Sequence, residues 1–130
     1  AKIVNCLRDK LDISWSNFKN YFSGSLFFSN DLKDINEFYK LYQNLMNFWQ
    51  SKLPNYFYNV EYDKLVNNPQ EEIKKLLNYI ELPWNENCLN HHKNKRSIKT
   101  ASSAQARKPI YKSSINSSED YKKYLKPFFD

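Results

Sequence analysis

Glycine is almost absent from this chain of 130 residues, in which Gly24 is the only one. Loops that cradle phosphate groups through close backbone approach need glycines at fixed spacing. The sequence therefore excludes a Gly-rich phosphate loop within these residues. Cysteine is scarce as well. Cys6 and Cys88 lie in unrelated contexts, which indicates a reducing compartment and a structural role for each, while a bond between the two stays open.

The chain also lacks an initiator Met, a leader-like segment and a long hydrophobic run. These absences favour a cytoplasmic protein. Hydrophobic residues make up 41% and aromatic residues 17%, which is enough for one packed core and excludes a disordered chain. The sequence opens at Ala1 and passes directly into the apolar run KIVNCL at residues 2–7. Because a domain rarely begins with a bare core strand, we expect a further part of the protein upstream of Ala1.

Acidic residues are missing between Asn87 and Ser118, a stretch that holds seven basic ones. The rest of the chain has 13 basic and 14 acidic residues, so the net charge of +6 comes from this stretch. A local cationic segment suits a compact polyanion such as a nucleotide phosphate. A solvated basic loop is the alternative. The seven residues are Lys93, Lys95, Arg96, Lys99, Arg107, Lys108 and Lys112.

Apolar spacing predicts strands and helices in alternation. Strands are expected at residues 2–7 and 56–61. Helices are expected at about residues 11–22, from Asp34 to before Pro54, from Pro69 to before Pro83, and at 121–129. Strands separated by helices favour parallel pairing and an α/β layer fold, although two strands are too few for an independent parallel sheet. The apolar faces carry Trp15, Trp49 and Trp84, which we expect in the core.

Arg8 and Ser16 form the first candidate site. Arg8 stands at the carboxyl end of the first expected strand, and Ser16 follows eight residues later in the next helix. Ligands of open α/β sheets bind at strand carboxyl ends near helix N-termini. An Arg there can donate two charge-assisted hydrogen bonds to a phosphate, and a hydroxyl can add a third. The alternative is an ion pair of Arg8 with Asp9 or Asp12 and a solvated Ser16.

Four blocks of sequence resemble the sulfotransferases that use 3′-phosphoadenylyl sulfate (PAPS). The pattern Arg8, Asp12, Ser16 after a strand resembles their 3′-phosphate-binding motif. The three other blocks are Trp49 with Leu53-Pro54 and the run VEYDKLVNNP at 60–69, then LPW at 82–84, and TASSAQARKPIY at 100–111. The segment at 100–111 resembles the form typical of the tyrosylprotein and tetratricopeptide-linked branch. This resemblance implies that tetratricopeptide repeats could lie upstream.

This resemblance implies a fold and a reaction. The fold would be a three-layer P-loop-type parallel sheet with flanking helices, of which residues 1–130 are the C-terminal part of a single domain. The N-terminal strand and the phosphate loop would be absent. The reaction would transfer a sulfuryl group from PAPS to a hydroxyl or amine of a small molecule, a glycan or a protein tyrosine. The product nucleotide would be adenosine 3′,5′-bisphosphate, with neither a metal nor a nucleic acid involved.

The resemblance also assigns residues. Arg8 and Ser16 would hold the 3′-phosphate and Tyr62 would lie near the adenosine, unless it only packs. The residues expected to fold over the nucleotide are Ser102, Ser103, Gln105, Arg107 and Lys108. As alternatives, the hydroxyls and the amide among them could satisfy loop backbone groups, and Lys108 could be solvated.

Three positions depart from the family pattern. Asp63 replaces a Glu, Asn20 stands where a second Arg is common, and Ser117-Ser118 lie where a further basic residue is common. The 5′-phosphosulfate loop and the catalytic base would lie upstream of Ala1, so we expect the isolated chain to be inactive. Two other functions stay open: a basic nucleic-acid-binding domain, which a steep salt dependence would reveal, and a non-catalytic interaction domain that kept the scaffold.

Overall fold

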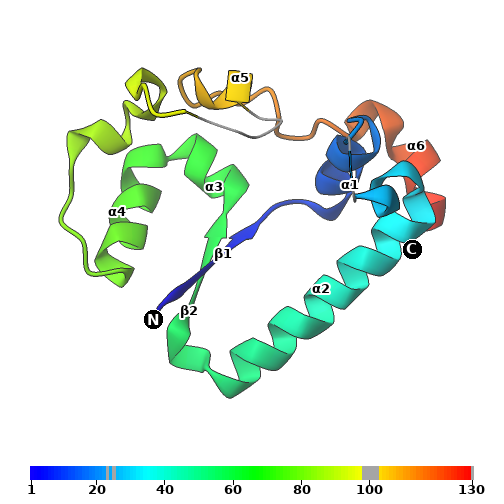
Figure 1. Ribbon diagram of the computed structural model, residues 1–130, viewed down its shortest axis with the longest axis horizontal. Helices are drawn as coiled ribbons and strands as arrows, with labels where there is room; N and C mark the ends of the chain where they lie inside the picture. The colour runs from blue at the N-terminus through cyan, green and yellow to red at the C-terminus, as the bar shows by residue number, and fades with distance from the viewer. Residues whose placement is uncertain (23, 25, 98–102, 130) are drawn as a thin grey trace. The chain divides into compact units, whose positions relative to one another are not determined.

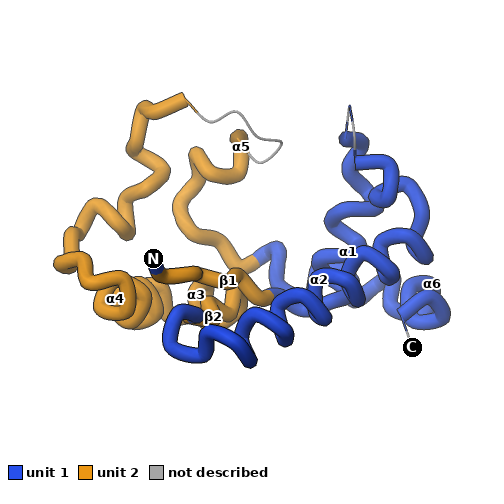
Figure 2. The backbone as a smooth tube through the Cα atoms, turned by 60° about the horizontal axis from the view of Figure 1, so that its bottom comes forward, with its two compact units in different colours: residues 1, 8–57, 113–130 blue, residues 2–7, 58–112 orange. Residues whose placement is uncertain are grey.

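The computed structural model describes residues 1–22, 24, 26–97 and 103–129. It divides into two compact units (Figure 2). Unit 1 comprises Ala1 and residues 8–57 and 113–130, and unit 2 comprises residues 2–7 and 58–112. We describe each unit by itself. Figure 1 labels the strands and the α-helices along the chain.

Unit 2 is built on a sheet of two parallel, hydrogen-bonded strands, β1 (Ile3–Leu7) and β2 (Phe57–Glu61). The positions of both strands confirm the sequence-based predictions, but the expected burial of the first strand is wrong, because Ile3 and Val4 of β1 are exposed. Asn5 of β1 donates to Asn59 of β2 through its side-chain amide, at 3.1 Å between Nδ2 and Oδ1. The mixed α/β class is therefore confirmed for the described residues, whereas the three-layer P-loop-type sheet stays a prediction.

The helices of unit 2 follow β2 directly. They are α3 (Tyr62–Asn67), α4 (Pro69–Tyr79) and the short α5 (Ser103–Ala106). Helix α4 begins at the predicted residue, with Pro69 in its first turn, but the Asn68 side chain makes no capping hydrogen bond. Short 3₁₀ turns, η3 (Glu86–Cys88) and η4 (His91–Lys93), come after it. Cys6 and Cys88 are both free thiols, so the bond left open by the sequence is not formed.

Unit 1 contains α1 (Lys10–Phe18), η1 (Phe27–Asn30), α2 (Leu32–Lys52) and η2 (Pro54–Tyr56). The C-terminal part of the chain adds η5 (Glu119–Tyr121), α6 (Lys122–Leu125) and η6 (Lys126–Phe128). The core of the unit is Ile35 of α2 with Leu125 and Phe129. Partly buried side chains pack against it, namely Leu11, Trp15, Phe28, Leu32 and Phe128.

Two helices differ in extent from their predictions. Helix α1 ends at Phe18 rather than near residue 22, and the Asn20 side-chain amide donates to the Ser16 carbonyl at 2.6 Å. This side chain takes up one of the carbonyl groups that a continuing helix would have bonded. The predicted terminal helix is divided into α6 between two 3₁₀ turns, because Pro127 has no N–H to donate and shortens the regular helix.

Helix α2 has the predicted position but not the predicted burial. Its expected apolar stripe is buried at Ile35, whereas Trp49 is exposed and so are Phe38, Leu41, Leu45 and Phe48. The expectation that Trp49 lies in the core is therefore wrong for this chain. The physical reason is coverage, because the described core of unit 1 packs only against the first turns of the helix. None of the described helices is both long and apolar enough to cross a membrane.

Candidate functional site

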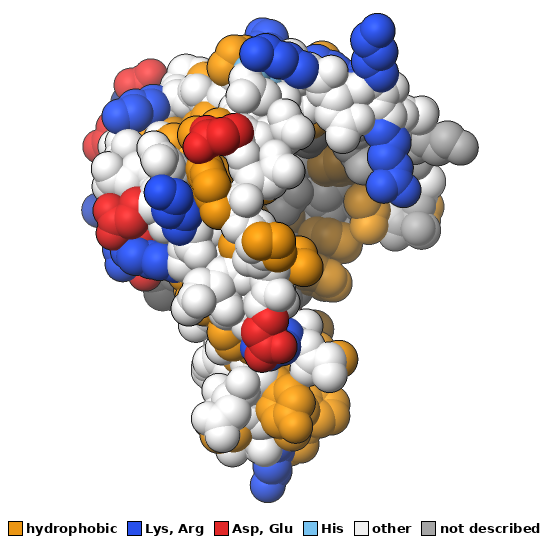
Figure 3. Space-filling model, turned by 90° about the vertical axis from the view of Figure 1, so that its left-hand side faces the viewer, with side chains coloured by type: hydrophobic (Ala, Val, Ile, Leu, Met, Phe, Trp, Pro, Cys, Tyr) orange, Lys and Arg blue, Asp and Glu red, His pale blue; other side chains and the backbone are white. Residues whose placement is uncertain are grey.

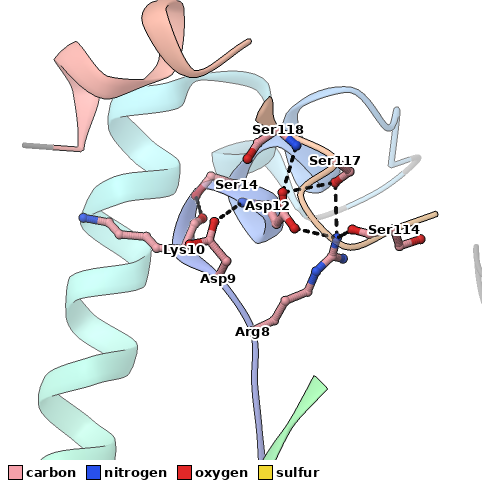
Figure 4. A network of polar contacts seen from close by, with 8 residues as sticks. All are labelled: Arg8, Asp9, Lys10, Asp12, Ser14, Ser114, Ser117 and Ser118. Carbon is pink, nitrogen blue, oxygen red and sulfur yellow. Dashed lines mark hydrogen bonds and ion pairs between the residues drawn. The ribbon is translucent and has the colours of Figure 1, made fainter. Parts of the chain in front are cut away.

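A network of polar contacts surrounds the carboxylate of Asp12 in unit 1 (Figure 4). Asp12 is 1% exposed. One oxygen, Oδ2, accepts from Nη2 of Arg8 at 3.3 Å. The other, Oδ1, accepts from the Ser118 backbone N–H at 2.8 Å and from the Ser117 hydroxyl at 3.3 Å. A buried carboxylate costs free energy unless it is paired and hydrogen-bonded, and here both oxygens are satisfied.

Arg8 is held at several points. It follows β1 directly, and its side chain is 18% exposed. Besides the ion pair with Asp12, its Nη2 donates to the Ser117 hydroxyl at 3.2 Å and to the Ser114 carbonyl. The sequence left an ion pair of Arg8 with Asp9 or Asp12 open, and the structure forms it with Asp12. A guanidinium held by a carboxylate and two further oxygens has a fixed direction, which a phosphate-binding Arg requires.

Local sequence explains why α1 begins beside Arg8. Asp9 is the N-cap, and its side-chain oxygen accepts from the Asp12 backbone N–H at 2.9 Å. Asp12 and Ser16 are four residues apart within α1, so their side chains lie on the same face about one turn from each other. Ser16 is half-buried, while Ser14 is fully buried and donates to the Lys10 carbonyl at 2.7 Å. Ser16 therefore lies one turn beyond Asp12, the ion-pair partner of Arg8.

The C-terminal segment is anchored to α1 by further contacts. Trp15 of α1 stacks on Tyr121, with 4.0 Å between ring centroids. The Lys10 ammonium donates to the Phe129 carbonyl at 3.0 Å. The contact of the serines with Asp12 thus belongs to a wider contact between the beginning and the end of unit 1. Sequence reasoning missed Ser114, Ser117 and Ser118 as partners within the site, because no local pattern links residues more than 100 positions apart.

The environment of Asp12 favours its charged form. Burial raises the pKa of the carboxyl, but the hydrogen bonds from Ser118 and the charge of Arg8 lower it, and the net pKa lies below the ordinary value. Hydrogen bonds that favour the charged form explain this direction. The charge of Asp12 also acts on Lys122, because the pKa of this ammonium is raised mainly by the hydrogen bond to Glu119 and in smaller part by Asp9 and Asp12.

We expect this contact to be lost in acid. A carboxyl whose pKa is lower in the folded state stabilises the fold above its unfolded pKa, about 3.9, and this stabilisation disappears as the pH falls through the folded value. The amide proton of Ser118, followed by NMR from about pH 6 to pH 2, should shift with a midpoint below 3.9. The Asp12→Asn variant should lack the transition. A midpoint above the ordinary Asp value would contradict the assignment.

The other predicted site residues belong to unit 2. Tyr62 begins α3 and is half-buried. Ser103 and Gln105 lie in α5, and the carbonyl of Gln105 accepts from the Lys108 backbone N–H at 3.0 Å. Arg107 and Lys108 are exposed, and Nη2 of Arg107 donates to the Arg96 carbonyl at 2.6 Å. Figure 3 shows several Lys and Arg side chains projecting from the upper edge of its view. Ser102 lies outside the described residues, as do Lys99 and Thr100.

The catalytic residues are expected upstream of Ala1, so none of the residues described above tests that prediction. Ala1 itself is exposed and precedes β1. The catalytic base and the 5′-phosphosulfate loop therefore stay predictions.

Unit 2 also has a hollow of about 520 Å³ between η3 and η4, which both contribute residues to its lining. None of the predicted site residues that the structure describes lines it. The described residues contain no group of three His, Cys, Asp or Glu side chains that could hold a metal ion. The two rings of His91 and His92 lie edge to face with centroids 5.7 Å apart. The hollow is lined by Asn87, Cys88, Asn90, His91, Lys93 and Asn94.

Comparison with known proteins gives two matches. Residues 1–86, which include Arg8, Asp12, Ser16 and Tyr62, match the model of the sulfotransferase family. A protein of Aquifex aeolicus (strain VF5), described as an uncharacterized protein, is 36% identical over 133 residues. That match covers 100% of this chain and 18% of the relative, so the chain spans less than a fifth of the relative's length.

Proposed function

This chain belongs to the sulfotransferase family, and we propose from that premise that it forms the 3′-phosphate side of a PAPS site. Arg8 is the residue that carries the proposal. It lies at the carboxyl end of β1, and three oxygen contacts fix the direction of its guanidinium. A guanidinium in a protein keeps its positive charge at every ordinary pH. Ser16 lies farther along α1 on the face that bears Asp12.

The proposed reaction is a displacement at sulfur. The acceptor oxygen forms a bond to sulfur while the bond between sulfur and the phosphate oxygen of PAPS breaks, and the acceptor proton passes to a base. Arg8 does not touch the reacting atoms in this scheme. Its charge holds the 3′-phosphate, so the binding energy of a remote group positions the nucleotide for transfer. The base and the 5′-phosphosulfate loop belong, in this proposal, to parts of a longer protein upstream of Ala1.

Further assignments extend the same proposal. Tyr62 contacts the adenosine, and the segment with Ser102, Ser103, Gln105, Arg107 and Lys108 supplies donors to the nucleotide. The two parallel strands belong to a larger P-loop-type sheet. The acceptor is a hydroxyl or amine of a small molecule, a glycan or a protein tyrosine. The protein tyrosine is included because residues 100–111 resemble the tyrosylprotein and tetratricopeptide-linked branch. The location is the cytoplasm.

A comparison of two nucleotides tests the proposal. The full-length protein should bind adenosine 3′,5′-bisphosphate more tightly than adenosine 5′-monophosphate by at least about tenfold, since a charged hydrogen-bonding site contributes at least about 1.5 kcal/mol. Calorimetric titration of both ligands gives the ratio. Equal affinities for the two ligands would contradict a 3′-phosphate site, and tight binding to oligonucleotides with a steep salt dependence would favour the nucleic-acid alternative.

Removal of the Ser16 hydroxyl should have a smaller effect. Ser16→Ala takes away one neutral donor and leaves Arg8 and its partners in place, so the affinity for adenosine 3′,5′-bisphosphate should fall by about 1 kcal/mol, or about fivefold. Asn17→Ala, at the neighbouring position of α1, is the control and should change the affinity little. A Ser16 variant that binds as tightly as the wild type would remove this residue from the site.

A further inference from the structure

The carboxylate of Asp12 divides its hydrogen bonds between two parts of unit 1. One oxygen, Oδ2, faces Arg8 at the end of β1, and the other, Oδ1, faces Ser117 and Ser118 near the end of the chain. The carboxylate is 1% exposed, so water cannot replace these partners without a change in packing. Whatever fixes Oδ1 therefore also fixes Oδ2, because the two oxygens share one rigid plane.

We propose that Asp12 is a positioning residue for the nucleotide site, which sets the direction of the Arg8 guanidinium by way of its own attachment to the Ser117 hydroxyl and the Ser118 backbone N–H. This inference rests on the proposed function of Arg8 in holding the 3′-phosphate. Asp12 itself does not contact the ligand. It acts by keeping the fork of Arg8 in the orientation that a phosphate requires, at the cost of one buried charge that the serines satisfy.

Ser117 and Ser118 supply neutral hydrogen-bond donors to Asp12. A basic residue at either position would place a second cation beside Arg8, where it would compete for Asp12. The neutral donors instead bind Oδ1 and leave Oδ2 to the guanidinium. Ser117 also donates to Asp12 while accepting from Arg8, so one hydroxyl connects both members of the ion pair. The C-terminal segment, docked through Trp15 and Tyr121, thereby contributes to the rigidity of Arg8.

Two physical effects of Asp12 oppose each other. Its negative charge repels a nearby phosphate, whereas its hydrogen bond orients the guanidinium that attracts the phosphate. Donors on both oxygens spread and partly neutralise the charge, which weakens the repulsion. A misdirected fork loses the two-point geometry on which Arg depends. We therefore expect orientation to outweigh repulsion, so that loss of the carboxylate lowers the affinity for the 3′-phosphate.

Asp12→Asn separates the two roles of this side chain. The backbone N–H of Ser118 makes the shortest contact, at 2.8 Å, and an Asn can accept it through its carbonyl oxygen. The amide nitrogen then takes the place of Oδ2 and presents a donor to the donor of Arg8. The C-terminal segment stays attached, while Arg8 loses the one charged acceptor among the three oxygens that hold its Nη2.

The test measures the binding of adenosine 3′,5′-bisphosphate and adenosine 5′-monophosphate to the full-length protein by calorimetry. The Asp12→Asn variant should lose about tenfold in affinity for the bisphosphate and keep its affinity for the monophosphate, so the ratio of the two falls. A merely structural role would change both affinities alike. Asp34→Asn, the same change at an exposed position of α2, is the matched control and should keep the wild-type ratio.

Each outcome decides a different question. If the wild type does not distinguish the two nucleotides, the proposed function fails. If the wild type distinguishes them and Asp12→Asn keeps or raises the ratio, the function stands and the positioning role is overturned. Ser117→Ala decides the matter if Asp12→Asn does not fold. It removes the hydroxyl that donates to Oδ1 and accepts from Arg8, so it should lower the ratio about threefold with the monophosphate affinity unchanged, whereas an unchanged ratio would also overturn the inference.

Discussion

Arg8→Ala in the full-length protein is expected to weaken the binding of adenosine 3′,5′-bisphosphate by on the order of 2 kcal/mol or more, or about 30-fold. The effect is large because a guanidinium is a permanent charge with donors in a rigid fork. Ala removes both the charge and the fork. The affinity for adenosine 5′-monophosphate, which lacks the 3′-phosphate, should change little, and calorimetric titration of both ligands measures the difference.

Two further variants separate charge from geometry. Arg8→Lys keeps the charge but replaces the planar fork by a single ammonium, so it should recover only part of the lost affinity. Lys33→Ala removes one exposed positive charge elsewhere in unit 1 and should leave the affinity unchanged. Unchanged affinity of Arg8→Ala would remove this residue from the site. Equal losses for both nucleotides would instead point to a loss of structure, since Ala leaves the buried Asp12 without its cation.

The elements around the site were predictable because their signals are local. A short apolar run gave the position of β1, an alternating aromatic pattern gave that of β2, and Pro69 marked the beginning of α4. The end of α1 was not predicted, since apolar spacing continues to Phe22 while the Asn20 side chain ends the helix through the Ser16 carbonyl. Periodicity reports which face of a helix is apolar. It does not report where side-chain competition for backbone carbonyls ends the helix.

The partners of the site were not predictable for a different reason. Charge and spacing indicated Arg8 and Ser16, and they left two acids open as partners of Arg8. The hydrogen bonds from Ser117 and Ser118 to Asp12 join residues 105 and 106 positions apart. No sequence pattern around a loop serine predicts its hydrogen-bond partner in a distant part of the chain. The exposure of the apolar stripe of α2 was unpredictable for a similar reason. The sequence shows which side chains would be stabilised by burial, but not whether another element covers them.

Leu125→Ala should destabilise unit 1 by about 3 kcal/mol, within the usual range of about 2–5 kcal/mol for truncation of a buried Leu. Leu125 is 2% exposed and packs with Ile35 and Phe129, which are the other buried members of this core. So small a core has few side chains that could move to fill the cavity. Hydrogen exchange of the unit 1 amides measures the effect, and protection in α1 and α2 should fall together.

The control for this effect is a Leu→Ala change on the same unit that opens no cavity. Leu45 of α2 is 55% exposed, so Leu45→Ala should alter the stability by no more than about 0.5 kcal/mol. The affinity for adenosine 3′,5′-bisphosphate should also fall in Leu125→Ala, because the segment that holds Ser117 and Ser118 against Asp12 is anchored by this core. If Leu45→Ala costs as much as Leu125→Ala, the stabilising contacts of unit 1 lie along α2 rather than beneath the C-terminal segment. That result would contradict the expectation that this core stabilises the phosphate site through the C-terminal segment.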